Sequence, residues 1–486
     1  MMEKTKQHSV KKNFFYSSIL TVSNYLFPMI VFPYVSRVLG VTNIGICNFV
    51  DSIVNYFMLF SMMGITVMGI REISSVKSDR MEMSRSFFSL IVINGIFTVL
   101  SAIALLVTAF TVESLQGYRH LLFISLFKLV GNFLLIEWFF KGLEDFKFIT
   151  NRTILVKLLY VASVFIFVRE QDDYVVYYIL SVMMVFVNAI FNGIYASRKV
   201  KFTLRGIQIK KYMNPFLYLG LYMILTNMYT SFNVIYLGFV KGDAEVGFYT
   251  TATKLYTIIL SLFTAFTSVM LPRMSALLSE KKEDEFFALI HKSMQMLVTL
   301  GVPVVLLSTL YSSQIIHILA GKGFEGAILP ARIVMPLMLI IGIEQILVIQ
   351  IMMPFKQDKI IFRNAVIGAA VGITLNLALV PMLGSTGSAI VWVVSEISVL
   401  LLSQMHVSRM YSVAFPAAPL FKTMIAYLPF VAISLLMPAV FDNEYVRLAI
   451  ACIVLAVNFV IVQFYVMPND FVKEALSKVT HRICKS

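Results

Sequence analysis

One apolar stretch of the sequence, near residues 246–271, carries its polar side chains on a single helix face. The polar residues follow one another at steps of three or four: Thr250, Lys254, Thr257, Ser261, Thr264 and Ser268. A lysine is a mobile point charge on a long stem and attracts anions, whereas Ser and Thr equally suit helix–helix packing. This face is therefore a candidate lining for an anion-binding cavity.

Ionisable side chains also lie well inside other apolar runs. There are seven in all: Asp51, Lys128, Glu137, Lys157, Lys254, Glu344 and Glu396. At about 3 kcal/mol each, they would cost about 20 kcal/mol if they faced lipid, so we expect them to face protein or water. Glu137 is expected at an interface beside Trp138, and Lys157 is expected to extend its ammonium toward the cytoplasm.

A second polar face occurs in the run near 44–66, formed by Asn48, Asp51, Ser52 and Asn55. Two interpretations of Lys254 follow. Either Lys254 pairs with Asp51 or another carboxylate and locks the helix bundle, or it joins a cationic lining that binds the substrate. The residues of that lining would be Lys254, Lys128, Arg37, Thr257, Ser261 and Asn55. Both interpretations can hold, because an ion pair that breaks when the substrate enters would act as a gate.

Three further residues are candidates for coupling or gating. Glu344 and Glu396 either bind a coupling H⁺ or Na⁺, or are carboxyl groups that are hydrogen-bonded within the bundle. Pro28, together with Pro33, removes backbone hydrogen bonds from the first apolar run. That run is then either a bending element or a helix with a static kink.

The composition indicates that lipid surrounds most of the chain. Of 486 residues, 59% are hydrophobic and only 14% are charged, against about a quarter in soluble proteins. Fourteen runs are long enough to span a bilayer, from 14–35 to 446–467. Of the 40 Lys and Arg residues, seven fall in connections on one side and three inside runs, which leaves 30 on the other side. The positive-inside rule then places both termini in the cytoplasm.

Several functional classes are excluded by missing motifs. The sequence has no GxxxxGK[ST], HExxH or GxSxG motif, its six histidines are scattered, and its three cysteines show no CxxC pair. We therefore expect no cofactor, no metal site, no disulfide framework and no enzymatic activity. The net charge of +14 is spread over the connections rather than clustered on one domain, which argues against a nucleic-acid partner.

The chain also repeats itself at a constant offset of 202 residues. Gly40 matches Gly242 and Gly45 matches Gly247; the alternative is duplicated hydropathy without homology. Six spans per copy make the copies parallel, related by a pseudo-two-fold axis along the membrane normal. The predicted fold is an all-α integral membrane protein of 14 transmembrane helices: a six-helix bundle over 1–202, a second over 203–410, and two additional helices with a cytoplasmic tail over 411–486.

Three segments of the sequence are similar to a known family. The segments "PYVSRVLGVTNIGICNF", "LPRMSALLSE" and "LAGKGFEGAILPARIVMP" resemble the polysaccharide-unit flippases of the multidrug/oligosaccharidyl-lipid/polysaccharide exporter superfamily. The resemblance implies a bacterial inner-membrane protein that moves an undecaprenyl-pyrophosphate-linked oligosaccharide from the inner to the outer leaflet by alternating access. The implied partners are the lipid bilayer, a polysaccharide polymerase and chain-length proteins.

Two other functions remain open. A drug or cation antiporter of the same superfamily would be expected to have twelve spans and a cavity rich in carboxylates. An integral-membrane polysaccharide polymerase or ligase would need sizeable external loops, yet the longest outer connection, around 311–331, has about twenty residues. The fourteen runs and the three lysines inside them favour the flippase.

Overall fold

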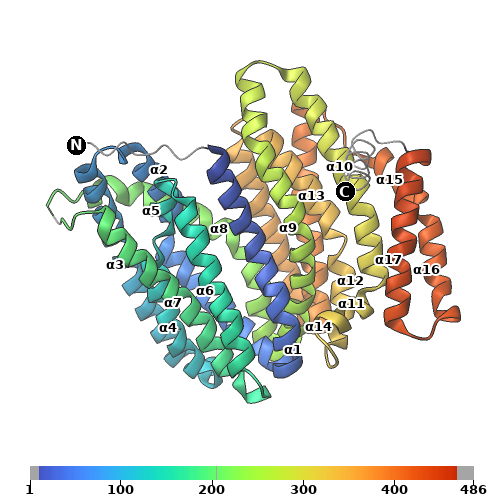
Figure 1. The fold of residues 1–486 in the computed structure, drawn as a ribbon, viewed down its shortest axis with the longest axis horizontal. Coiled ribbons are helices and arrows are strands. Elements are labelled where there is room, and N and C mark those ends of the chain that lie inside the picture. Colours follow the sequence, from blue (N-terminus) through green and yellow to red (C-terminus); the bar gives the residue numbers. More distant parts are fainter. Residues whose placement is uncertain (1–9, 204, 468–486) are drawn as a thin grey trace, which may run out of the picture. The chain divides into compact units, whose positions relative to one another are not determined.

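The computed structural model describes residues 10–203 and 205–467, and for parts of 10–14, 218–231 and 261–272 it describes the backbone alone. The described residues form helices and short connections (Figure 1). The helices of the first half are α1 (Val10–Met62), α2 (Ile65–Val76), α3 (Arg80–Thr111), α4 (Arg119–Leu135), α5 (Glu137–Gly142), α6 (Phe146–Phe167) and α7 (Tyr174–Lys199), with short 3₁₀ turns at Glu113–Tyr118 and Gln171–Asp173.

The second half continues with α8 (Ile209–Lys241), α9 (Asp243–Ser279), α10 (Glu283–Leu310), α11 (Ser312–Leu319), α12 (Ile328–Val334), α13 (Leu337–Gln345), α14 (Asp358–Tyr411), α15 (Ala417–Ala426), α16 (Leu428–Val440) and α17 (Glu444–Ile461). A short 3₁₀ turn, η3 (Glu325–Ala327), precedes α12. Two π-helical segments, η4 (Ile346–Met352) and η5 (Val462–Val466), extend α13 and α17.

Among the described residues, nine helical segments are long and apolar enough to cross a membrane, or ten if the bent pair α15–α16 is one span. Their surfaces carry many large apolar side chains that are exposed in the isolated chain. Such surfaces are stable only against lipid tails or other apolar partners. The all-α membrane fold expected from the sequence is confirmed at this level.

Two of the helices are too long to be single spans. α1 has 53 residues and α14 has 54, so each would extend for about 80 Å at 1.5 Å per residue. Each is broken inside by one glycine with positive φ: Gly40 in α1 (φ 74°) and Gly384 in α14 (φ 58°). The parts before and after the glycine are called the first and second arms of each helix: 10–39 and 41–62 in α1, and 358–383 and 385–411 in α14. Glycine adopts this conformation because it has no Cβ to clash with the backbone.

The described chain forms two compact units. The first contains residues 1–250, 319–324 and 369–391, and the second contains residues 251–318, 325–368 and 392–486. In the first unit, α4 packs on α7 and α3, and α6 packs on α7 and α1. In the second unit, α10 packs on α13 and α15, and α16 packs on α17.

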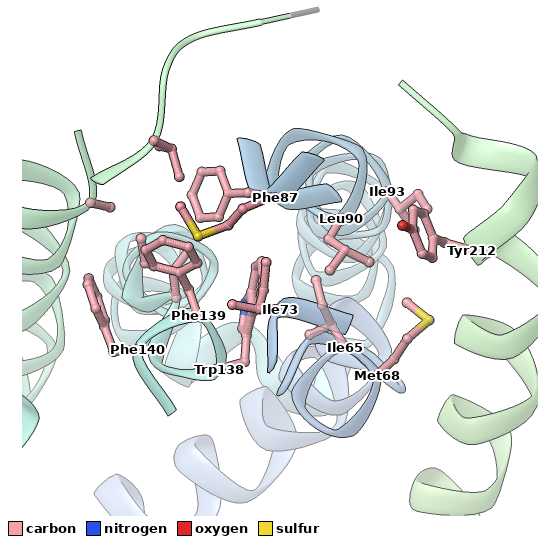
Figure 2. Close-up of a cluster of buried hydrophobic side chains, with 14 of the residues drawn as sticks. Ile65, Met68, Ile73, Phe87, Leu90, Ile93, Trp138, Phe139, Phe140 and Tyr212 are labelled. Carbon is pink, nitrogen blue, oxygen red and sulfur yellow. The ribbon is translucent and has the colours of Figure 1, made fainter. Parts of the chain in front are cut away.

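An aromatic cluster fixes the connection between α4 and α6, the helices that carry Lys128 and Lys157. Trp138, Phe139 and Phe140 of the short helix α5 are buried (Figure 2). Trp138 and Phe139 pack on Phe87 of α3, and Phe140 packs on Phe139. The Trp138 ring packs on Gly69, where an added Cβ would come within 2.5 Å of it. Removal of this much aromatic surface from solvent holds α5 firmly on α2 and α3.

Candidate functional site

A charged network joins the second arm of α1 to α4 and α7. Lys128 donates to Asp51 through Nζ and Oδ1 at 2.7 Å. Tyr178 donates to the same Asp51 oxygen at 2.9 Å and is hydrogen-bonded to Ser125 at 2.7 Å. The Lys128 side chain is only 13% exposed and that of Asp51 is 36% exposed. The network therefore neutralises an acid and a base that would each be costly alone in an apolar medium.

A second ion pair lies between α5 and α6. Arg152, whose side chain is 3% exposed, donates from Nη2 to Glu137 Oε1 at 3.0 Å. Lys141 approaches the other oxygen of Glu137 at 3.4 Å. The sequence pattern missed this pair, because Glu137 and Arg152 are 15 residues apart and lie on different helices. The signal that could have revealed it is that Arg152 lies among apolar residues, where an arginine needs a partner.

Lys157 has a different environment. Its ammonium donates to Asn24 Oδ1 at 2.6 Å and to Ser23 Oγ at 3.3 Å. It also lies over the Phe27 ring, 5.6 Å from the centroid. All three of these neighbours belong to the first arm of α1 and are uncharged. Lys157 is therefore held by α1 rather than extended toward the cytoplasm as expected.

The polar face of the 246–271 run lies on α9. Lys254 is half-buried, and the exposed Thr257 uses its hydroxyl on the backbone oxygen of Thr253 at 2.7 Å. The side chain of Ser261 lies outside the described residues. Asn55, expected beside this face, is half-buried on the second arm of α1.

The start of α9 crosses the second arm of α1 through two glycines. A Cβ added to Gly45 would lie 1.8 Å from the backbone oxygen of Asp243, and one added to Gly247 would lie 2.2 Å from that of Val41. One turn further along both helices, Asn48 Nδ2 donates to Thr250 Oγ1 at 2.9 Å. Each of these contacts relates positions that are equivalent at the 202-residue offset, because 41, 45 and 48 correspond to 243, 247 and 250.

The remaining candidates on α1 lie on its first arm. Arg37 is exposed, donates to the backbone oxygen of Pro33, and packs its stem on Gly321. Pro28 is exposed within the helix. The backbone departs from helical φ and ψ at Gly40 rather than at Pro28, so the break in α1 lies twelve residues beyond the proline.

Two carboxyl groups meet inside the second unit. Glu396 of α14 is 4% exposed and accepts from Trp392 Nε1 at 3.0 Å. Glu344, at the end of α13, is hydrogen-bonded to Glu396, and its Oε2 is buried with no hydrogen-bond partner among the described residues. A hydrogen bond between two carboxyl groups requires a proton on one of them, because carboxylates only accept. The pair can therefore hold a proton.

In the described parts of the chain, no group of three or more His, Cys, Asp or Glu side chains could hold a metal ion. The candidate residues described above offer charged and hydrogen-bonding groups on helices.

The fold of this chain is shared with membrane proteins of known structure. The fold is similar to that of a structure described as "Lipid II flippase MurJ, inward closed conformation", with a TM-score of 0.75 and 16% identity over 93% of this chain and 98% of that one. It is also similar to an inward-facing multidrug resistance MATE family transporter of the MOP superfamily, with a TM-score of 0.61 and 12% identity over 83% of this chain and 100% of that one. The chain therefore shares the all-α, multi-pass membrane fold of both structures.

Residues 10–278 match the family described as polysaccharide biosynthesis protein, and the chain belongs to that family. A relative from Escherichia coli (strain K12), described as "Putative O-antigen transporter", is 25% identical over 408 residues, which cover 83% of this chain and 98% of the relative. A relative of the same description from Shigella dysenteriae is 26% identical over 415 residues, which cover 81% and 98%. The family resemblance found in the sequence is thereby confirmed.

Proposed function

We propose that this protein moves an undecaprenyl-pyrophosphate-linked oligosaccharide from the inner to the outer leaflet of the bacterial cytoplasmic membrane by alternating access. The observation that carries the proposal is the match to two O-antigen transporter relatives over 98% of their length. Membership of the polysaccharide biosynthesis family supports the same substrate class. A polysaccharide polymerase and chain-length proteins would act on the product at the outer face.

The proposed topology has fourteen spans with both termini in the cytoplasm. Ten spans are supported by length and composition among the described residues. Counting the two arms of α1 and of α14 separately adds two more, and α8 and α9 add another two. The total of fourteen agrees with the number of apolar runs in the sequence.

We also propose that residues 1–202 and 203–410 are repeats about a pseudo-two-fold axis, with 411–486 outside them. The contacts of Gly45 with Asp243 and of Gly247 with Val41 support this. They are the same contact made once from each repeat, because 45 corresponds to 247 and 41 corresponds to 243. The conformations of Gly40 and Gly242, with φ of 74° and 84° and extended ψ, support it as well. Two backbones in such close contact would have to separate if this crossing opened.

Substrate binding is proposed for the cations and polar groups on α1, α4 and α9: Lys254, Lys128 and Arg37, with Thr257, Ser261 and Asn55. In this proposal the Asp51–Lys128 pair is a gate, because a pyrophosphate would compete with Asp51 for the ammonium. Pro28 and Gly40 would let the first arm of α1 bend. Glu344 and Glu396 would exchange a coupling H⁺, or Na⁺ in its place.

The membrane potential offers a second driving force. A pyrophosphate carries about two negative charges, and moving each of them outward across a negative-inside membrane releases roughly 2.3 kcal/mol per 100 mV. Transport in vesicles should therefore slow when the potential is collapsed at constant pH. An unchanged rate would mean that a cation moves with the substrate, and Glu344→Gln and Glu396→Gln would then be the variants to measure.

Reconstituted vesicles test the proposed function directly. The purified full-length protein should equilibrate a fluorescent undecaprenyl-pyrophosphate oligosaccharide between leaflets, scored by quenching with a membrane-impermeant reductant. Lys254→Arg should retain most of the rate, and Lys254→Glu should lose it. Efflux of a cationic dye without movement of the lipid would indicate the antiporter instead, and formation of longer glycans would indicate a polymerase or ligase.

A further inference from the structure

Basic residues inside the first unit differ in how their charge is compensated. Lys128 is paired with Asp51 at 2.7 Å, and Arg152 is paired with Glu137 at 3.0 Å. In the described part of the chain, Lys157 forms no ion pair; Glu137 acts on it at longer range and is already bound by Arg152. Of Lys128, Arg152 and Lys157, the last is the one with no carboxylate at ion-pair distance among the described residues.

The depth of Lys157 excludes escape to the membrane surface. It is the twelfth residue of the 22-residue helix α6, about 16 Å from its start at 1.5 Å per residue. Its partner Asn24 is the fifteenth residue of α1. A lysine side chain reaches about 6 Å, so the ammonium stays near the middle of both helices, where an uncompensated charge costs about 2.5–3.5 kcal/mol.

The first arm of α1 has two exposed sides of opposite character around the contact with Lys157. Thr21, Asn24 and Pro28 are exposed and lie within about 60° of one another on the helix. Large apolar side chains are exposed on roughly the opposite side: Val22, Leu26, Met29 and Ile30. The apolar side suits lipid tails, so the polar side with Asn24 suits a wet surface, and the ammonium borders it.

The contacts of Lys157 leave donors available for an anion. An ammonium has three N–H donors, and Lys157 uses two of them, on Asn24 and Ser23. Asn24 accepts through Oδ1, and its amide nitrogen donates to none of the described residues. Ser23 uses its own proton on the backbone oxygen of Leu20 at 2.7 Å. One ammonium N–H and one amide group thus meet on the exposed polar side.

We propose that Lys157 and Asn24 form a binding site for a phosphate group carried by a lipid. A phosphate oxygen would accept hydrogen bonds from both residues, and its negative charge would compensate the ammonium of Lys157. The assignment of this phosphate to the pyrophosphate of the transported lipid rests on the proposed function. The same chemistry would accept the phosphate of an ordinary anionic phospholipid, and the experiment must separate the two.

The experiment measures ligand binding to the full-length protein in nanodiscs of phosphatidylcholine, with farnesyl pyrophosphate as the probe. Wild type should bind, Lys157→Arg should keep the affinity within about threefold, and Lys157→Gln should lose about tenfold or more, as expected for one charge-assisted hydrogen bond. The matched control is Lys147→Gln, an exposed lysine in the first turn of the same helix, which should bind as wild type does. The thermal unfolding midpoint of each variant checks that the fold is kept.

A second arm identifies the source of the phosphate. Phosphatidylglycerol in the nanodisc should leave the binding of farnesyl pyrophosphate to wild type unchanged. If phosphatidylglycerol instead displaces the probe in wild type and not in Lys157→Gln, the phosphate site holds, but its link to the transported lipid is refuted. Equal affinity of wild type and Lys157→Gln with normal folding would overturn the site itself. Loss of leaflet exchange in vesicles with binding intact would refute only the proposed transport.

Discussion

Lys128 and Lys157 are residues of one type in one unit, and their surroundings are opposite. Lys128 lies among Asp51, Tyr178 and Ser125, where charge and hydrogen bonds are compensated within the protein. Lys157 lies against amide, hydroxyl and ring groups that carry no charge. The role of a charged residue inside a membrane span can therefore be inferred only when its partner is known. A charge that is compensated by another residue links helices, and one that is not compensated is a candidate for binding a ligand.

The largest expected effect comes from breaking the compensated pair. Lys128→Ala leaves Asp51 without its cation, and removal of one partner of a buried pair costs 3–5 kcal/mol. Because Asp51 is 36% exposed, water screens part of this, and we expect about 1–3 kcal/mol of lost stability. Thermal unfolding in detergent should show a lowered midpoint for Lys128→Ala and a nearly unchanged one for Lys157→Ala.

A double variant serves as the control for this prediction. Lys128→Ala with Asp51→Asn leaves no unpaired charge, so most of the lost stability should return. An equal loss of stability in Lys157→Ala would contradict the comparison, because it would show that the uncharged contacts of Lys157 stabilise the fold as much as an ion pair does.

A smaller effect is expected from the tyrosine that orients the pair. Tyr178→Phe removes the 2.9 Å hydrogen bond to Asp51 and the 2.7 Å bond with Ser125, while the ring itself stays buried. We expect about 1–2 kcal/mol of destabilisation from unfolding in denaturant. Ser125→Ala, which removes only the bond to the tyrosine, should cost less. A neutral Tyr178→Phe would mean that Lys128 alone satisfies Asp51.

The smallest effect concerns the ring beneath Lys157. Phe27→Leu keeps an apolar contact and removes the cation–π attraction at 5.6 Å, which is worth about 0.5–1 kcal/mol. The free energy of unfolding should fall by about 0.5–1 kcal/mol, and the affinity for farnesyl pyrophosphate should stay within about threefold of wild type, because the attraction is present with and without the ligand. A change as large as that of Lys157→Gln would assign the main role at this site to the ring.

Much of the fold could be predicted because it depends on local composition. The apolar runs predict membrane helices, and the described residues contain nine to ten helical segments that are long and apolar enough to cross a membrane. The glycine pairs found at the 202-residue offset lie at conformational breaks and at a helix crossing. Gly45 and Gly247 are needed because a side chain would collide with the opposite backbone. Gly40 and Gly242 are needed because their φ is positive.

The candidate site was less predictable. Helical spacing shows which residues share a face, but it does not show which helix that face meets. Asp51 was considered as a partner for Lys254, and the structure pairs it with Lys128, 77 residues along the chain. The sequence predicts for Glu344 and for Glu396, each by itself, either a coupling role or a hydrogen bond within the bundle. The structure adds that the two are hydrogen-bonded to each other.

The membrane environment, the helical class, the positions of the glycine breaks and the set of charged residues inside apolar runs all follow from residue type and from spacing within one helix. Which of those charges are compensated depends on the fold, because an ion pair requires two atoms within a few ångströms and packing across the whole unit brings their helices together. Lys128 and Lys157 look alike in the sequence, and it is their neighbours on α1 that separate them.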